Sequence, residues 1–139
     1  MNRSQRTARY LAFAGTLLAG ALAVHAAPDV HIPPRVQNNP DVPYEAYNGA
    51  PTMLMAIVEG DGCLNGVQAQ WDINGDGDYA DANEELRNYP GNGYFSRVEL
   101  DVQYPPAEGD RRYFPKVRVV CGGGEGTATM PVQVWVDRV

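Results

Sequence analysis

The chain has 139 residues, 11 basic and 17 acidic side chains, and a formal net charge of -6. This length fits one small domain. The acidic balance excludes a nucleic-acid binder, which needs a basic face.

The start of the chain has the pattern of a signal peptide. Three arginines lie within the first nine residues, an apolar run of about 15 residues follows, and a small-residue cleavage signal ends at Ala26. The run is too short to span a membrane comfortably. We expect residues 1–26 to be a signal peptide, and the mature protein to be secreted into the periplasm or the extracellular space, with no membrane span.

Residues 27–43 form a proline-rich segment. Five prolines lie between Pro28 and Pro43, and no apolar periodicity is visible there. Such a composition favours an extended, polyproline-like conformation. The sequence therefore predicts that this segment lies outside the core, and that the folded domain comprises residues 44–139.

Short strands are predicted along the rest of the chain. A continuous apolar run at residues 53–58 indicates a strand buried on both faces, and the later segments alternate apolar and polar residues. The alternating segments are 67–71, 94–102, 117–121 and 130–136.

The remaining features punctuate these strands. Residues 122–126 predict a loop because four of the five are glycine, and Ala82–Asn88 is a possible helical turn. Pro115 and Pro131 interrupt strand patterns, which places them at strand starts, edges or bulges. Together these features predict an all-β fold, a two-layer antiparallel β-sandwich.

Cys63 and Cys121 are the two cysteines of the chain. In an oxidising compartment, an even pair in a small domain favours a disulfide over two buried free thiols, which is the alternative. Closing a loop of this length would stabilise the fold by about 4 kcal/mol in the chain-entropy model.

An acidic loop follows the strand that ends at Trp71. Six acidic residues lie between positions 72 and 85 with no basic residue among them. Oxygen ligands recur at every second residue and Gly77 permits a sharp turn, as a calcium loop requires. The alternative is a solvated acidic turn whose side chains bond to nearby backbone amides. The predicted calcium ligands are Asp72, Asn74, Asp76, Asp78, Asp81 and Glu84.

The spacing of this loop resembles the first half of an EF-hand loop. It departs from that pattern at the twelfth position, which is Asn83 instead of glutamate, and a β pattern precedes it where an EF-hand has a helix. Asp81 is a possible N-cap, with Glu84 at the third position of the turn.

The segment as a whole resembles the polycystic kidney disease (PKD) domain. The resemblance rests on Trp71-Asp72 before an Asp/Gly-rich turn, on Gly93-Tyr94 leading into an alternating strand, and on a closing strand rich in valine. It implies an immunoglobulin-like β-sandwich with Trp71 in the core. In that arrangement the two cysteines would lie in loops at one end of the sandwich, where they could be bridged.

A fold resemblance does not give a function. His31 is the one histidine after residue 26, so the sequence offers no Ser-His-Asp triad or zinc site, and the spacing of the acids favours ion binding over glycoside cleavage. We expect a non-catalytic, calcium-binding domain for adhesion, matrix or surface interaction, with an extracellular protein or glycan as partner. The alternative is a small secreted carbohydrate- or protein-binding module, such as an inhibitor, that uses an exposed aromatic residue. Trp135 on the polar phase of the last strand is the candidate ligand-binding residue.

Overall fold

The computed structural model describes residues 27–47, 49–105 and 109–136. The predicted signal peptide lies outside these residues. Within them the regular structure is ten strands and a single 3-10 turn, η1 (Asp61–Cys63), and no helix is long and apolar enough to cross a membrane. The strands are β1 (Asp29–His31), β2 (Tyr44–Tyr47), β3 (Thr52–Glu59), β4 (Gly66–Asp72), β5 (Arg87–Pro90), β6 (Ser96–Val102), β7 (Arg111–Tyr113), β8 (Lys116–Cys121), β9 (Gly124–Thr129) and β10 (Val132–Trp135).

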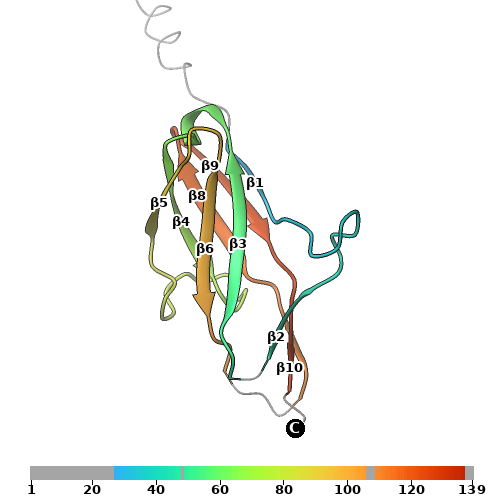
Figure 1. Cartoon of the computed structure of the whole chain (residues 1–139). Coiled ribbons are helices and arrows are strands. Elements are labelled where there is room, and N and C mark those ends of the chain that lie inside the picture. Colours follow the sequence, from blue (N-terminus) through green and yellow to red (C-terminus); the bar gives the residue numbers. More distant parts are fainter. Residues whose placement is uncertain (1–26, 48, 106–108, 137–139) are drawn as a thin grey trace, which may run out of the picture.

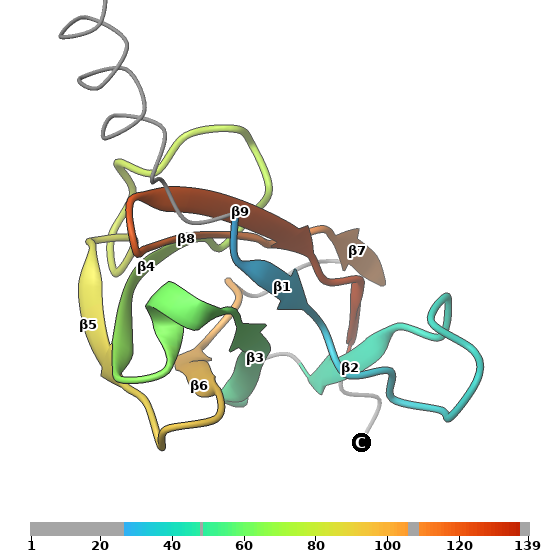
Figure 2. The same cartoon turned by 90° about the horizontal axis from the view of Figure 1, so that it is seen from above.

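The strands form a two-layer sandwich (Figures 1 and 2). One layer is the sheet β1-β3-β6, and the facing layer is the sheet β5-β4-β8-β9. A third sheet, β2-β10-β7, lies at the end of the sandwich near the C-terminus. Pairing is antiparallel except between β2 and β10, which run parallel. The all-β, immunoglobulin-like sandwich predicted from the sequence is confirmed.

Two prolines separate the third sheet from the four-stranded one. Pro115 lies between β7 and β8, and Pro131 lies between β9 and β10, so each is placed just before a strand, as the sequence predicts. The amide of Met130 donates to the carbonyl of Pro115 at 2.9 Å, which keeps the two chain segments together at the break. Proline has no N–H for the ladder, and the strands therefore change partners at these positions.

The core lies between the two layers and is built by alternation. Val67, Ala69 and Trp71 of β4 are buried, with Trp71 at 0% exposure, as predicted. Strand β3 differs from the prediction because only one of its faces is fully buried: Met53, on the outer face, is 47% exposed. The physical reason is that no second layer covers the outer face of β1-β3-β6 in the described structure.

The proline-rich segment is not wholly extended outside the core. Residues 29–31 form β1, which pairs with β3, and Val30 and Ile32 pack against the core. β1 also lies against β9, where Gly126 leaves room for it: a Cβ atom at that position would stand 2.7 Å from the carbonyl oxygen of Pro28. The segment thus closes one side of the sandwich (Figure 2).

Three predicted boundaries differ from the structure. The possible helical turn at Ala82–Asn88 is absent, and Arg87–Pro90 forms β5 beside β4. The glycine run is a hairpin rather than a loop throughout, because Gly124 already begins β9. Strand β6 begins at Ser96 and not at residue 94 as predicted. The side chain of Asn92 accepts hydrogen bonds from the backbone amides of Tyr94 and Phe95, which keeps these two residues in a turn.

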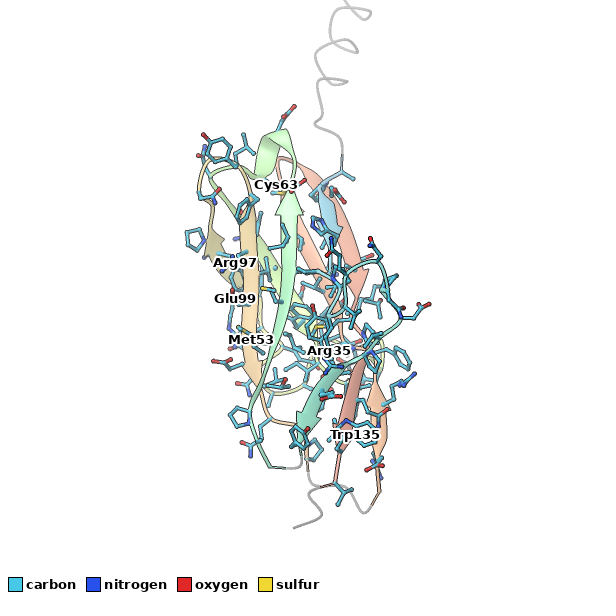
Figure 3. The ribbon with its side chains drawn as sticks, turned by 45° about the vertical axis from the view of Figure 1, so that its right-hand side comes forward. Arg35, Met53, Cys63, Arg97, Glu99 and Trp135 are labelled. Carbon is cyan, nitrogen blue, oxygen red and sulfur yellow. A yellow bond between two sulfur atoms is a disulfide. The ribbon has the colours of Figure 1, made fainter. Side chains whose placement is uncertain are left out.

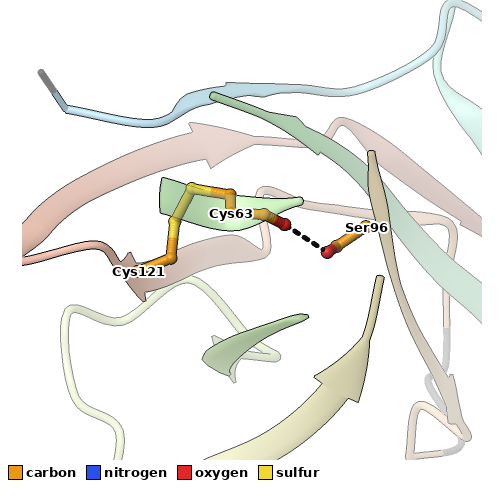
Figure 4. Close-up of a disulfide and its surroundings, with 3 residues drawn as sticks. All are labelled: Cys63, Ser96 and Cys121. Carbon is orange, nitrogen blue, oxygen red and sulfur yellow. Dashed lines mark hydrogen bonds between the residues drawn. A yellow bond between two sulfur atoms is a disulfide. The ribbon is translucent and has the colours of Figure 1, made fainter. Parts of the chain in front are cut away.

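Cys63 and Cys121 form the predicted disulfide (Figure 4). Cys63 ends the 3-10 turn between β3 and β4, Cys121 ends β8, and their Cα atoms are 5.2 Å apart. The hydroxyl of Ser96 donates to the backbone carbonyl of Cys63 at 2.9 Å, and all three residues are buried. The bridge therefore ties the β3–β4 connection to the end of β8.

Candidate metal site

The acidic loop connects β4 to β5, and Asp72 organises its first turn. Asp72 is 1% exposed, and its carboxylate accepts hydrogen bonds from the amides of Gly75, Asp76 and Gly77 at 2.8 to 3.2 Å. Gly75 adopts a φ of +72°, and a Cβ atom there would collide with the carbonyl oxygen of Phe114. Backbone amides that donate to a buried carboxylate replace the water that it loses, and so reduce the free-energy cost of burying it. Asp72 is the residue that folds the loop over the end of β4.

Glu84 anchors the other end of the loop. Its side chain is also 1% exposed, and its two oxygens accept hydrogen bonds from the amides of Ile73 at 3.0 Å and Asp81 at 3.3 Å. Burial raises the pKa of the Glu84 carboxyl above its ordinary value, although the two amides oppose that shift. Glu84 thus reaches back to the amide of Asp81, as a capping residue does, but no helix follows.

Three exposed carboxylates gather on the outer side of the loop. Asp76, Asp78 and Asp81 each place an oxygen within 4.8 Å of the others. The side-chain nitrogen of Asn74, Nδ2, donates to the carboxylates of both Asp76 and Asp81, at 3.2 Å in each case, which holds these two carboxylates toward one another. Carboxylate and amide oxygens are ligands for hard cations. This cluster could hold a metal ion.

No basic side chain neutralises the cluster among the described residues. The described part of the chain contains five ion pairs, and none of them involves Asp76, Asp78 or Asp81. Arg118 stacks over the ring of Tyr79, in the same loop, at 5.2 Å and pairs with Glu125. Like charges at such short range repel, so a cation would lower the free energy of the folded loop.

The six predicted ligands therefore fall into two groups. The structure brings Asp76, Asp78 and Asp81 together with Asn74, whereas the carboxylates of Asp72 and Glu84 are occupied by backbone amides. Backbone bonding is not confined to the buried pair: Asp76 and Asp78 each accept a hydrogen bond from the amide two residues further on. The two interpretations from the sequence thus both apply to this loop. Some of its side-chain oxygens accept backbone amides and hold the turn, while the exposed carboxylates of Asp76, Asp78 and Asp81 form the cluster that could hold an ion.

Two stacked tyrosines support the base of the loop. Tyr104, 3% exposed, donates its hydroxyl to the carbonyl of Ile73 at 2.8 Å and stacks on Tyr113 with ring centroids 4.3 Å apart. Burial raises the pKa of the Tyr104 phenol. Asn74 and Asp81 also line a cavity of about 610 Å³ that reaches these tyrosines. The cluster therefore stands beside a hollow, on a loop fixed to the core.

Trp135 lies at the end of β10, the central strand of the third sheet. It is 37% exposed, while its neighbour Val134 is buried, as the predicted polar phase requires. The parallel pairing of β10 with β2 places Tyr47, 53% exposed, directly beside it. Sequence reasoning missed Tyr47, because only the pairing of strands about ninety residues apart in sequence places the two residues in register.

Comparison with known proteins identifies no family. No protein-family profile matches the chain, and no curated protein sequence matches it. A solved structure that aligns in part with this chain is a family 123 glycoside hydrolase from Clostridium perfringens, studied for glycolipid glycan hydrolysis. The alignment has 11% identity and a TM-score of 0.41, and it covers 70% of this chain but 23% of that one.

Proposed function

We propose that this chain is an exported, non-catalytic domain that binds calcium in its acidic loop and serves in adhesion, matrix or surface interaction. The observation that carries the proposal is the cluster of Asp76, Asp78 and Asp81, whose oxygens lie within 4.8 Å of one another without a basic partner among the described side chains.

Calcium suits this loop better than magnesium. Calcium accepts six to eight oxygens in loose geometry, whereas magnesium requires a strict octahedron and releases its water reluctantly. The cluster offers three exposed carboxylates, whereas the side-chain oxygen of Asn74 accepts the backbone amide of Asp76. Water can supply the remaining ligands.

Export and the absence of catalysis have separate support. A disulfide is typical of proteins that fold in an oxidising compartment, in agreement with the signal-like start of the chain. His31, the one histidine among the described residues, lies on exposed β1, where its ring stands 3.9 Å from Asp29. Among the described residues, no serine, threonine or cysteine side chain is hydrogen-bonded to its ring, as a catalytic triad would require.

The test is a thermal melt in millimolar calcium and in excess chelator. Extracellular calcium sites often have a Kd of about 0.1 to 1 mM. Calcium at about 1 mM is a tenfold excess over the tighter of these values, and RT ln(1 + [L]/Kd) is then about 1.4 kcal/mol. Calcium should therefore raise the melting temperature, and magnesium at the same concentration should raise it less.

Asparagine variants locate the ion. Asp76→Asn, Asp78→Asn and Asp81→Asn should each weaken the calcium response. The matched control is Asp61→Asn, which removes an exposed carboxylate from η1, before β4, and should leave the response intact. Melting curves that coincide in calcium and chelator would contradict the proposal, as would an equal effect of the control.

A further inference from the structure

A pair of exposed aromatic rings stands at the end of the third sheet. Trp135 and Tyr47 are register partners across the parallel strands β10 and β2. Register partners point to the same face, and neighbouring strands lie about 4.8 Å apart, so both aromatic side chains project from neighbouring positions on one face of the sheet. Figure 3 shows Trp135 near the C-terminal end of the molecule, on the side that also carries Arg35.

A row of polar side chains lies next to this pair. Two residues earlier along the same strands, Gln133 is in register with Glu45 on one side and with Arg112 of β7 on the other. A step of two residues corresponds to about 7 Å along a strand. We call the surface formed by Tyr47, Trp135 and this row the Trp135 face.

The polar row is held in place by its own contacts. Gln133 accepts a hydrogen bond from Nε of Arg112 at 3.3 Å and donates to the backbone carbonyl of Arg111 at 3.1 Å. One of the five N–H donors of the Arg112 guanidinium is used in this way, and the other four belong to its terminal nitrogens. A guanidinium fixed at Nε presents these donors with little loss of entropy on binding.

Charges around the Trp135 face are balanced, although the chain is acidic. Arg35 pairs with Glu45 at 3.4 Å. Arg112 and Asp110 add one charge of each sign two residues apart in sequence, and the Asp110 carboxylate accepts the amide of Val136 at 3.1 Å. Among the described residues, two positive and two negative side chains thus lie on or beside this face, while the whole chain has a formal charge of -6. A surface without net charge is complementary to an uncharged ligand.

From this arrangement we infer that the Trp135 face binds a neutral polysaccharide chain. A pyranose ring has an apolar C–H face that can stack on Trp135 or Tyr47, and its hydroxyls can bond to the adjacent polar row. The repeat of an extended glycan is of the same order as the step between the two rows. One sugar unit can therefore lie on the rings while the next reaches Arg112 and Glu45.

The layout fits a glycan better than a protein partner or a second copy of the chain. Protein interfaces have an apolar centre enclosed by a polar rim, and their strongest anchors lie near that centre. Here the aromatic pair occupies the last register position among the described residues, and the polar row borders it along the strands. The inference rests on the interaction role in the proposed function, but it does not require the calcium site.

Affinity electrophoresis tests this inference with the mature protein. Native gels containing a soluble β-glucan, xylan or galactomannan are compared with gels containing heparin or alginate. We expect at least one neutral polysaccharide to retard the protein and the anionic ones not to. Trp135→Ala and Tyr47→Ala should each weaken the retardation by about tenfold.

The control variant is Tyr94→Ala. Tyr94 is 81% exposed but precedes β6, away from the third sheet, so its loss should not change the retardation. Acrylamide quenching gives an independent readout, because Trp71 is buried and Trp135 is the accessible indole. The bound polysaccharide should protect Trp135 from the quencher.

Four results would overturn the inference. They are retardation by none of the neutral polysaccharides, retardation by the anionic ones alone, an equal loss in Tyr94→Ala, and sugar-independent self-association that Trp135→Ala abolishes. The last result would show that a second copy covers the face. If calcium stabilises the protein but no polysaccharide binds, this inference fails alone; if a polysaccharide binds and calcium has no effect, the metal proposal fails alone.

Discussion

Removing the disulfide should produce the largest change in stability that one bond can cause in this protein. The bridge joins residues 58 positions apart, and closing a loop of that length reduces the entropy of the unfolded chain by an amount worth about 4 kcal/mol at room temperature. For a domain of about a hundred residues, this corresponds to a fall of roughly 15 to 30 °C in melting temperature. The perturbation is the double variant Cys63→Ala/Cys121→Ala.

Urea and thermal unfolding followed by circular dichroism measure this loss. The wild type, reduced and alkylated while unfolded, should refold to a state that melts close to the double variant, because both lack the cross-link. The hydrogen bond from Ser96 to the backbone of Cys63 does not depend on the sulfur atoms, so the local structure should persist. A double variant that melts within a few degrees of the wild type would refute the reasoning, since the unfolded chain would then not be constrained by the bridge.

Two other predictions concern buried aromatic residues. Trp71→Ala should lower the free energy of unfolding by about 3 to 5 kcal/mol and weaken the calcium response, because Trp71 is fully buried next to Asp72 at the base of the loop. Trp135→Ala should lower it far less. If Trp135→Ala were the more destabilising variant, the buried and exposed faces would be wrongly assigned. The phenol of Tyr104 has a pKa above its ordinary value of 10.0 in the folded state, so the unfolded chain loses this proton first. Stability should therefore be retained below about pH 10 and fall as the pH rises further, and urea unfolding across this range should show a shallower fall in Tyr104→Phe.

Only some of the residues that form the candidate metal site could be predicted from the sequence. Acidic residues at alternate positions with glycine between them identify the loop, because turn geometry depends on neighbouring residues. Which carboxylates face outward depends on the rest of the fold. Asp72 and Glu84 resemble the other acids in sequence, but the loop closes onto the core at their positions, and their oxygens are taken by backbone amides.

The sequence by itself determined the features that arise from local periodicity and composition. Alternation of apolar residues identified β4, β6, β8 and β10 and the buried face of Trp71, since side chains alternate between the two faces of any strand. The two prolines marked the points where strands change partner, because proline cannot donate to a ladder. The pairing of the two cysteines followed from their number.

Only the tertiary structure decided what depends on contacts between distant segments. β1 became part of a sheet because β3 offered it a free edge and Gly126 left space for it, which proline content alone does not reveal. The parallel pairing of β2 with β10 set Tyr47 beside Trp135. Strand partners separated by most of the chain are chosen by packing of the whole domain, and local sequence patterns do not encode that choice.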